Sequence, residues 1–218
     1  MRWNERKLQI LLALLVAALI TLSGVSGVMA KYSTQEGING QITYTAAIGQ
    51  IGIWERPVSY TATGGFTIGE NREFAQKGKS YPIIPGLDIP KDTIVKVDRD
   101  NNDDGIDDAL TPAYVYLIVD TNIVSDPYGV SYTLDSCWRP IDSTKHPGVY
   151  VYSDNSGNAV ALNSSVEIPV LVGEKLFVSQ HVTGRVTDTV YMNFSVKMRQ
   201  IVGEQTPAQI YESAGYSN

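Results

Sequence analysis

The stretch VYMNFSVKMR, residues 190–199, carries the clearest structural pattern in the chain. One side of it presents Val190, Met192, Phe194, Val196 and Met198. The other side presents Tyr191, Asn193, Ser195, Lys197 and Arg199. This period of two predicts a β-strand with one face in a core. A slip of one residue would invert both faces, so we expect a firmly set register.

Other segments repeat this strand signal. Residues 114–120 (YVYLIVD) are apolar or aromatic on both faces, which predicts a central strand covered on both sides. Pro169 favours an edge position for the strand expected at residues 166–171. Further strands are expected at residues 41–48, 93–97, 130–134, 149–153, 159–162 and 176–182. Glycines and Pro57 predict a break after the first of these, and residues up to 79 are weakly patterned.

Only one segment of the mature chain reads as a helix. Residues 206–214 begin with Thr206 as N-cap and Pro207 in the first turn, and Gly215 would stop the helix. About eight short strands separated by turn residues complete the pattern. We therefore predict an all-β, jelly-roll-like antiparallel β-sandwich with one short C-terminal helix.

The N-terminus resembles an export signal. Arg2, Arg6 and Lys7 precede an uncharged run at residues 8–29, and small residues lead to Ala30. We expect a signal helix, cleavage between Ala30 and Lys31, and a secreted product in the extracellular matrix or at the cell surface. The alternative is an uncleaved membrane anchor, because the run is long enough to span a bilayer. The expected parts are a signal peptide at 1–30, a flexible tether at 31–40 and the sandwich domain at 41–218.

The charge balance and the cysteine content narrow the range of functions and covalent cross-links that the chain can have. The chain has 17 basic and 23 acidic residues, and three and one of these lie in the leader, which leaves 14 against 22 in the mature chain. Such an acidic balance argues against sequence-independent nucleic-acid binding. A single cysteine, Cys137, excludes an internal disulfide and is interpreted as a small apolar residue.

An acidic loop at residues 98–108 is the most distinctive chemical feature. Its core, DNNDDGIDD at residues 100–108, fits the first nine positions of an EF-hand calcium loop, although residue 111, at the twelfth position, is Thr and not Glu. The loop holds six Asp against one Arg, and this self-repulsion favours a counterion. We predict a structural calcium site, with an ordinary solvated turn as the alternative. The expected ligands are Asp100, Asn102, Asp104, the Ile106 carbonyl and Asp108.

Catalytic motifs are scarce. His146 and His181 are the only histidines, and neither belongs to an HExxH motif. No recognisable nucleophile motif joins Ser, Cys and His. We therefore expect no enzymatic activity and interpret both histidines as surface or packed residues.

Five segments together resemble the TasA/camelysin family, whose members carry a SipW-type signal peptide. The segments are AKYST (30–34), PIIPGLDIPKDTIVKV (82–97), TPAYVYLIVD (111–120), VEIPVLVGEKLFVSQHV (166–182) and MNFSVKMRQIVGEQTPAQIYESA (192–214). In the family a P-G-x-x-x-x-K-D segment precedes a strand, matched here by Pro85, Gly86, Lys91 and Asp92. The resemblance implies a jelly-roll subunit of extracellular biofilm fibres, in which the N-terminal segment of one copy fills a sheet gap in the next.

The residues themselves are compatible with such assembly. An exposed sheet edge can be satisfied by an extended peptide that seats alternate side chains in pockets. After cleavage by signal peptidase, a donor strand would carry Tyr32, Ile38, Ile42 and Tyr44. The expected partner is a second copy of the chain, together with accessory matrix proteins. The same strand can instead fold back into its own sheet.

Two further classes of function stay open at this point. One is a monomeric surface adhesin or ligand-binding domain that uses some of the 13 tyrosines as a binding face. The other is a hydrolase, since camelysin-like proteins have been described as proteases, although no zinc motif supports it here.

Overall fold

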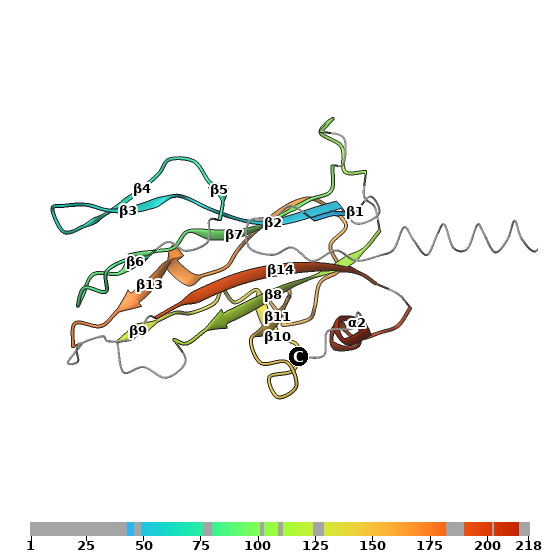
Figure 1. The fold of residues 1–218 in the computed structure, drawn as a ribbon. Helices are drawn as coiled ribbons and strands as arrows, with labels where there is room; N and C mark the ends of the chain where they lie inside the picture. The colour runs from blue at the N-terminus through green and yellow to red at the C-terminus, as the bar shows by residue number, and fades with distance from the viewer. Residues whose placement is uncertain are drawn as a thin grey trace, which may run out of the picture. The chain divides into compact units, whose positions relative to one another are not determined.

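Antiparallel strands dominate the structure, which is a computed structural model (Figure 1). It describes residues 43–45, 49–75, 80–100, 103–108, 111–123, 129–181, 190–201 and 203–213. All of them belong to one of the chain's two units, Thr34–Asn218. The predicted signal peptide, its cleavage position and the tether at 31–40 lie outside these residues.

One main sheet has the strand order β1-β2-β7-β12, and β5 also pairs with β2. All of its pairs are antiparallel. The strands are β1 (Thr43–Thr45), β2 (Gly49–Glu55), β5 (Glu73–Phe74), β7 (Thr93–Asp98) and β12 (Val166–Pro169). Pro169 therefore lies in an end strand of the described sheet, as predicted.

The second main sheet has the order β10-β11-β8-β14, again antiparallel throughout. Its strands are β10 (Trp138–Pro140), β11 (Val149–Tyr152), β8 (Ala113–Thr121) and β14 (Met192–Gln200). The chain crosses from the first sheet to the second between β7 and β8, and back between β11 and β12. These crossings are those of a jelly-roll-like sandwich.

Two smaller groups of strands complete the described part. β6 (Ile89–Pro90), β13 (Lys175–Val178) and β9 (Val130–Ser131) form a short sheet, entered through the 3-10 helix η1 (Val172–Glu174). β3 (Val58–Tyr60) and β4 (Phe66–Ile68) form a hairpin. The weak pattern of this region hid the hairpin, because Ser59, Thr67 and most of their neighbours face solvent.

The core lies between the two main sheets, and β14 packs against β2 across it. Apolar side chains from both inner faces are almost completely buried, with Val95 and Leu117 at 0% exposure and Ile53 and Val196 at 2%. Phe194, Val196 and Met198 all belong to this core, so the face predicted for residues 190–199 is confirmed. The predicted all-β sandwich is confirmed with it.

The outer face of β8 is also covered, as its sequence predicts. Helix α2 (Pro207–Ser213) places Tyr211 against Tyr116, whose hydroxyl donates to the Pro207 carbonyl at 2.8 Å. Thr206 caps the helix by accepting the Gln209 N–H at 3.3 Å.

Residues 49–55 correct one expectation. The glycines there predict a break, yet Gly49–Glu55 is a buried strand that pairs with β7 on one side and with β1 and β5 on the other. A side chain at Gly52 would meet the Phe74 ring at 3.2 Å. The glycine thus makes room for an aromatic neighbour and does not end the strand.

Candidate functional site

The acidic loop folds as a tight turn around Asp100. The Asp100 carboxylate accepts the backbone N–H groups of Asp104 at 3.3 Å and of Gly105 at 2.7 Å. Gly105 has a φ of +85°, a backbone conformation that residues with a side chain rarely adopt. Asp104 in turn accepts the Ile106 N–H at 2.9 Å. The carboxylates of Asp100 and Asp104 therefore both bind backbone N–H groups of the same turn.

The predicted calcium ligands are only partly brought together. Asp100 and Asp104 share the turn, whereas Asn102 lies outside the described residues. Ile106 is 65% exposed, and Asp108 is exposed while its N–H donates to the Arg99 carbonyl at 2.9 Å. Among the described residues, no three His, Cys, Asp or Glu side chains converge as a metal site would require. Calcium binding stays a prediction.

Asp107, which is not among the predicted ligands, anchors the loop to the sandwich. It accepts the Ser165 N–H at 3.0 Å and the Ser165 hydroxyl, while the Arg99 N–H donates to the same hydroxyl oxygen at 2.8 Å. The hydrogen bonds from Ser165 hold the pKa of Asp107 below its ordinary value. The sequence alone gives no reason to join the two residues, because 58 positions separate them.

An open groove of about 530 Å³ lies beside this anchored loop. Four carboxylates line it, from Asp98, Asp100, Asp107 and Glu167, with Lys96 as the basic residue. The Lys96 ammonium lies 3.7 Å from Asp98. This concentration of carboxylate oxygens is suited to cations and unsuited to anionic ligands.

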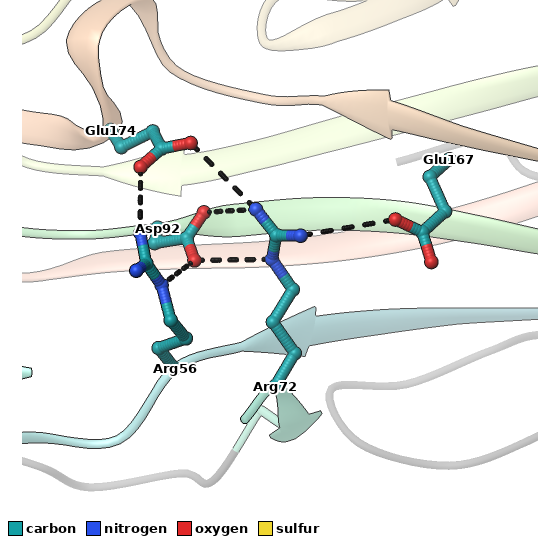
Figure 2. A network of polar contacts seen from close by, with 5 residues as sticks. All are labelled: Arg56, Arg72, Asp92, Glu167 and Glu174. Atoms are coloured by element: carbon teal, nitrogen blue, oxygen red, sulfur yellow. Dashed lines mark hydrogen bonds and ion pairs between the residues drawn. The ribbon is translucent and has the colours of Figure 1, made fainter. Parts of the chain in front are cut away.

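A second polar cluster is centred on Asp92, which is 1% exposed (Figure 2). Arg72 binds its carboxylate through two N–H groups, at 2.8 and 3.1 Å, and Arg56 donates to it as well. Glu174 accepts from Arg56 at 2.9 Å, and Glu167 lies 3.8 Å from Arg72. Burial raises the pKa of Asp92, but the hydrogen bonds from Arg72 and Arg56 outweigh it and leave the pKa below its ordinary value.

This cluster joins segments that are distant in the chain. Arg56 follows β2, Arg72 precedes β5, Asp92 precedes β7 and Glu174 lies in η1. Next to it, Lys91 pairs with Glu55, which is 5% exposed. The Lys-Asp pair of the family-like motif thus takes part in three ion pairs, and in each of them the carboxylate is buried. We assign this cluster, called the Asp92 clamp below, a structural role, because its donors and acceptors satisfy one another.

The predicted donor strand is described only at its end. Tyr44 lies in β1 and pairs with Gln50 of its own chain. Tyr32, Ile38, Ile42 and the cleavage pair Ala30 and Lys31 lie outside the described residues. Within the described sheet, β1 is an end strand of three residues, and it follows directly in the sequence after Ile42 of the predicted donor strand.

The histidines and the cysteine have partners of ordinary structural kinds. His146 contacts Glu212 of α2 at 3.0 Å and lies edge-on to Tyr211. The backbone N–H of His181 donates to the Ser179 hydroxyl at 3.1 Å. Burial raises the pKa of the Cys137 thiol to about 12, with the nearby Asp135 adding to the effect. Such a thiol is a poor nucleophile at neutral pH.

Comparisons with known proteins do not assign the chain to a family. No family model, no curated protein and no solved structure matches it significantly. Within the part of the chain that the structure describes, no helix has the length and apolar character needed to cross a membrane.

Proposed function

We propose that this protein is an exported structural subunit of an extracellular fibre or biofilm matrix, and that its copies join by exchange of the N-terminal strand. The resemblance to the TasA/camelysin family and the export-type N-terminus support the proposal. The observation that carries it is the place where the chain enters the sandwich. The predicted donor strand leads directly into β1, a three-residue strand at the end of its described sheet.

Such an entry strand is weakly held. β1 makes only three residue pairs with β2, from Thr43↔Ile51 to Thr45↔Gly49. A short end strand has few hydrogen bonds to lose, so β1 itself can leave its own sheet at low cost. An arm in an extended state can then pair with the edge of another sheet, where backbone hydrogen bonds supply affinity.

Calcium would support the subunit without taking part in chemistry. Asp100 and Asp104 have the residue types and the turn that a calcium loop needs, and the adjoining groove adds Asp98, Asp107 and Glu167. An ion there would offset the repulsion among these carboxylates and stiffen the acidic loop between β7 and β8.

The test is deletion of residues 31–40 from the secreted chain. The shortened chain should keep its thermal transition, because the deleted residues precede every described strand, and it should form no filaments by negative-stain microscopy. Replacing the same ten residues with a Gly-Ser segment of equal length is the matched control, since it keeps the length and removes the side chains. Filaments of normal yield from the deletion variant would refute strand exchange, and filaments from the Gly-Ser variant alone would show that the backbone of the segment suffices.

A monomeric adhesin is the second candidate, and the β3–β4 hairpin favours it. Phe66 lies between the rings of Tyr60 and Tyr81, at 5.4 and 6.0 Å, and Tyr60 and Ile68 are 41% and 44% exposed. Partly exposed aromatic groups of this kind are common in binding faces. Size-exclusion chromatography that gives only monomers, with and without calcium, would favour the adhesin over the fibre subunit.

A further inference from the structure

We propose that Asn163 is an N-glycosylation site, and that its glycan keeps one face of the sandwich out of contacts between copies. This inference rests on the export that the proposed function includes, because N-glycans are attached to exported chains. The chain holds two acceptor triplets of the N-x-S type, at residues 163–165 and 193–195. The triplet alone is a weak signal, so the surroundings of each asparagine have to decide between them.

Asn163 stands in a short surface connection between two paired segments. It follows Leu162, which is 8% exposed and pairs with Ala113, and it precedes β12. Asn163 and Ser164 are both exposed, and among the described residues the Asn163 side chain has no hydrogen-bond partner. A bulky, hydrated group on its amide would therefore displace no contact of the described fold.

Asn193 has different surroundings. It lies in the paired part of β14, opposite Asp120, and its Nδ2 atom donates to the Asp120 carboxylate at 3.4 Å. The middle residue of this triplet, Phe194, is 5% exposed and belongs to the main core. A glycan on Asn193 would replace the hydrogen bond to Asp120 in the middle of a sheet. The structure therefore favours Asn163 over Asn193 as the site of the glycan.

The third residue of the triplet indicates when the glycan is attached. An acceptor triplet needs a hydroxyl group at this position. In the folded domain the Ser165 hydroxyl donates to Asp107 and accepts the Arg99 N–H at 2.8 Å, so it is already engaged. Attachment therefore has to precede the anchoring of the acidic loop, while the exported chain is still unfolded.

The reaction is a glycosyl transfer from a lipid-linked oligosaccharide. The Asn163 Nδ2 atom forms a bond to the anomeric carbon of the first sugar, and the bond from that carbon to the phosphate oxygen of the lipid carrier breaks. The carrier leaves with the bonding electron pair, and the amide nitrogen loses one proton. The transfer needs no oxidant or reductant.

One hydrogen bond just after β12 shows which way the backbone of this strand points. The Val170 N–H donates to the Thr93 carbonyl of β7 at 3.0 Å. Alternation along the strand then turns the even-numbered residues of β12 toward β7, and residues 165, 167 and 169 away from it. Because β12 ends the described sheet, these three residues form its outer edge.

This outer edge offers little to a neighbouring copy. The Ser165 N–H donates to Asp107 at 3.0 Å, and Pro169 has no N–H. The third residue, Glu167, carries a side chain that is 56% exposed, and charge and proline both hinder pairing at a sheet edge. Ser165 and Glu167 also line the acidic groove. A glycan on Asn163 would shield the edge and the groove together, so we expect this face to point away from neighbouring copies.

Peptide mapping by mass spectrometry tests the site on the protein secreted by its own cells. Trypsin separates the two triplets, because Asn163 falls in residues 146–175 and Asn193 in residues 186–197. The first peptide should carry the mass of an oligosaccharide, and the second should be unmodified. Both peptides without a glycan, or any glycan on residues 186–197, would overturn the inference.

A pair of substitutions at Ser165 provides the matched control. Ser165→Ala leaves Asn163 in place but removes the hydroxyl of the triplet, so residues 146–175 should lose the glycan. Ser165→Thr keeps a hydroxyl and should keep the glycan. A glycan that persists in the Ser165→Ala variant would contradict the proposal, because its attachment would not depend on the triplet.

Assembly of the wild type and of the Asn163→Gln variant separates this inference from the proposed function. The variant keeps a neutral amide and lacks only the glycan, so both chains should form filaments in equal yield by negative-stain microscopy. A yield that differs between them would overturn the outward face, because the glycan would then lie in a contact between copies. Filaments from neither chain would count against the fibre function and leave the glycosylation site standing.

Discussion

Replacing Asp92 with asparagine should weaken the domain by removing the charge at the centre of the Asp92 clamp. Asp92 is 1% exposed, and its carboxylate accepts hydrogen bonds from both Arg56 and Arg72. Loss of one partner of a buried ion pair costs about 3–5 kcal/mol. The two arginine side chains are 32% and 34% exposed, so water can resolvate them. We therefore expect the lower end of that range, about 3 kcal/mol.

Thermal unfolding followed by circular dichroism measures this effect. For a domain of this size, 1 kcal/mol corresponds to about 2–4 °C, so the Asp92→Asn variant should melt about 6–12 °C below the wild type. Glu167→Gln is the matched control in the same clamp. Its side chain is 56% exposed and lies 3.8 Å from Arg72, so we expect a change within about 0.5 kcal/mol.

The effect should depend on pH with a defined sign. Because the pKa of Asp92 is lowered in the folded protein, its contribution to stability is complete above the ordinary carboxyl pKa of about 4. That contribution disappears as the pH falls through the lower folded value. The melting difference between wild type and Asp92→Asn should therefore be constant near pH 7 and shrink below about pH 4. Equal stabilities at pH 7, or a loss in Glu167→Gln as large as in Asp92→Asn, would refute the reasoning.

Three further predictions concern the acidic loop and the cysteine. Calcium at one hundred times its dissociation constant should stabilise the wild type by about 2.7 kcal/mol. The double variant Asp100→Ala, Asp104→Ala should show no calcium-dependent rise in melting temperature. Identical wild-type melting curves with calcium and with chelator would eliminate the site. Ser165→Ala should raise the pKa of Asp107 toward its ordinary value in an NMR titration, and an unchanged pKa would show that the hydroxyl does not hold the loop. Cys137 should resist alkylation at pH 8 until the domain unfolds, because its pKa is raised to about 12; rapid labelling of the folded chain would contradict this.

The parts of the fold that follow from local rules could be predicted from the sequence. The alternation in residues 190–199 fixes which side chains of β14 face the core, because strand geometry alone sets that direction. The cap at Thr206 and the helix start at Pro207 are equally local. Two-sided apolarity in residues 114–120 correctly indicated that both faces of β8 are covered.

Features that depend on distant partners could not be predicted. Lys197 and Arg199 belong to a polar face by pattern, yet they are 9% and 3% exposed in the structure. The Lys197 ammonium lies 5.7 Å from the centre of the Tyr211 ring. No period of two can indicate that a helix from the end of the chain will cover that face.

The candidate sites show the same division. The turn around Asp100 follows from the spacing of Asp and Gly within a few residues, so its geometry was accessible. The Asp92 clamp joins Arg56 to a carboxylate 36 positions away and to Glu174 118 positions away. Charged residues in weakly patterned segments carry no signal of their partners, and only the Lys-Asp pair of the family-like motif pointed to this place.

The most direct test of the account is a cryo-EM structure of filaments grown from purified chain that begins at Lys31. We predict that residues 31–42 of each copy form a strand in a sheet of the next copy. A map in which this segment pairs only within its own copy, or in which neighbouring copies touch without sharing a strand, would contradict the account.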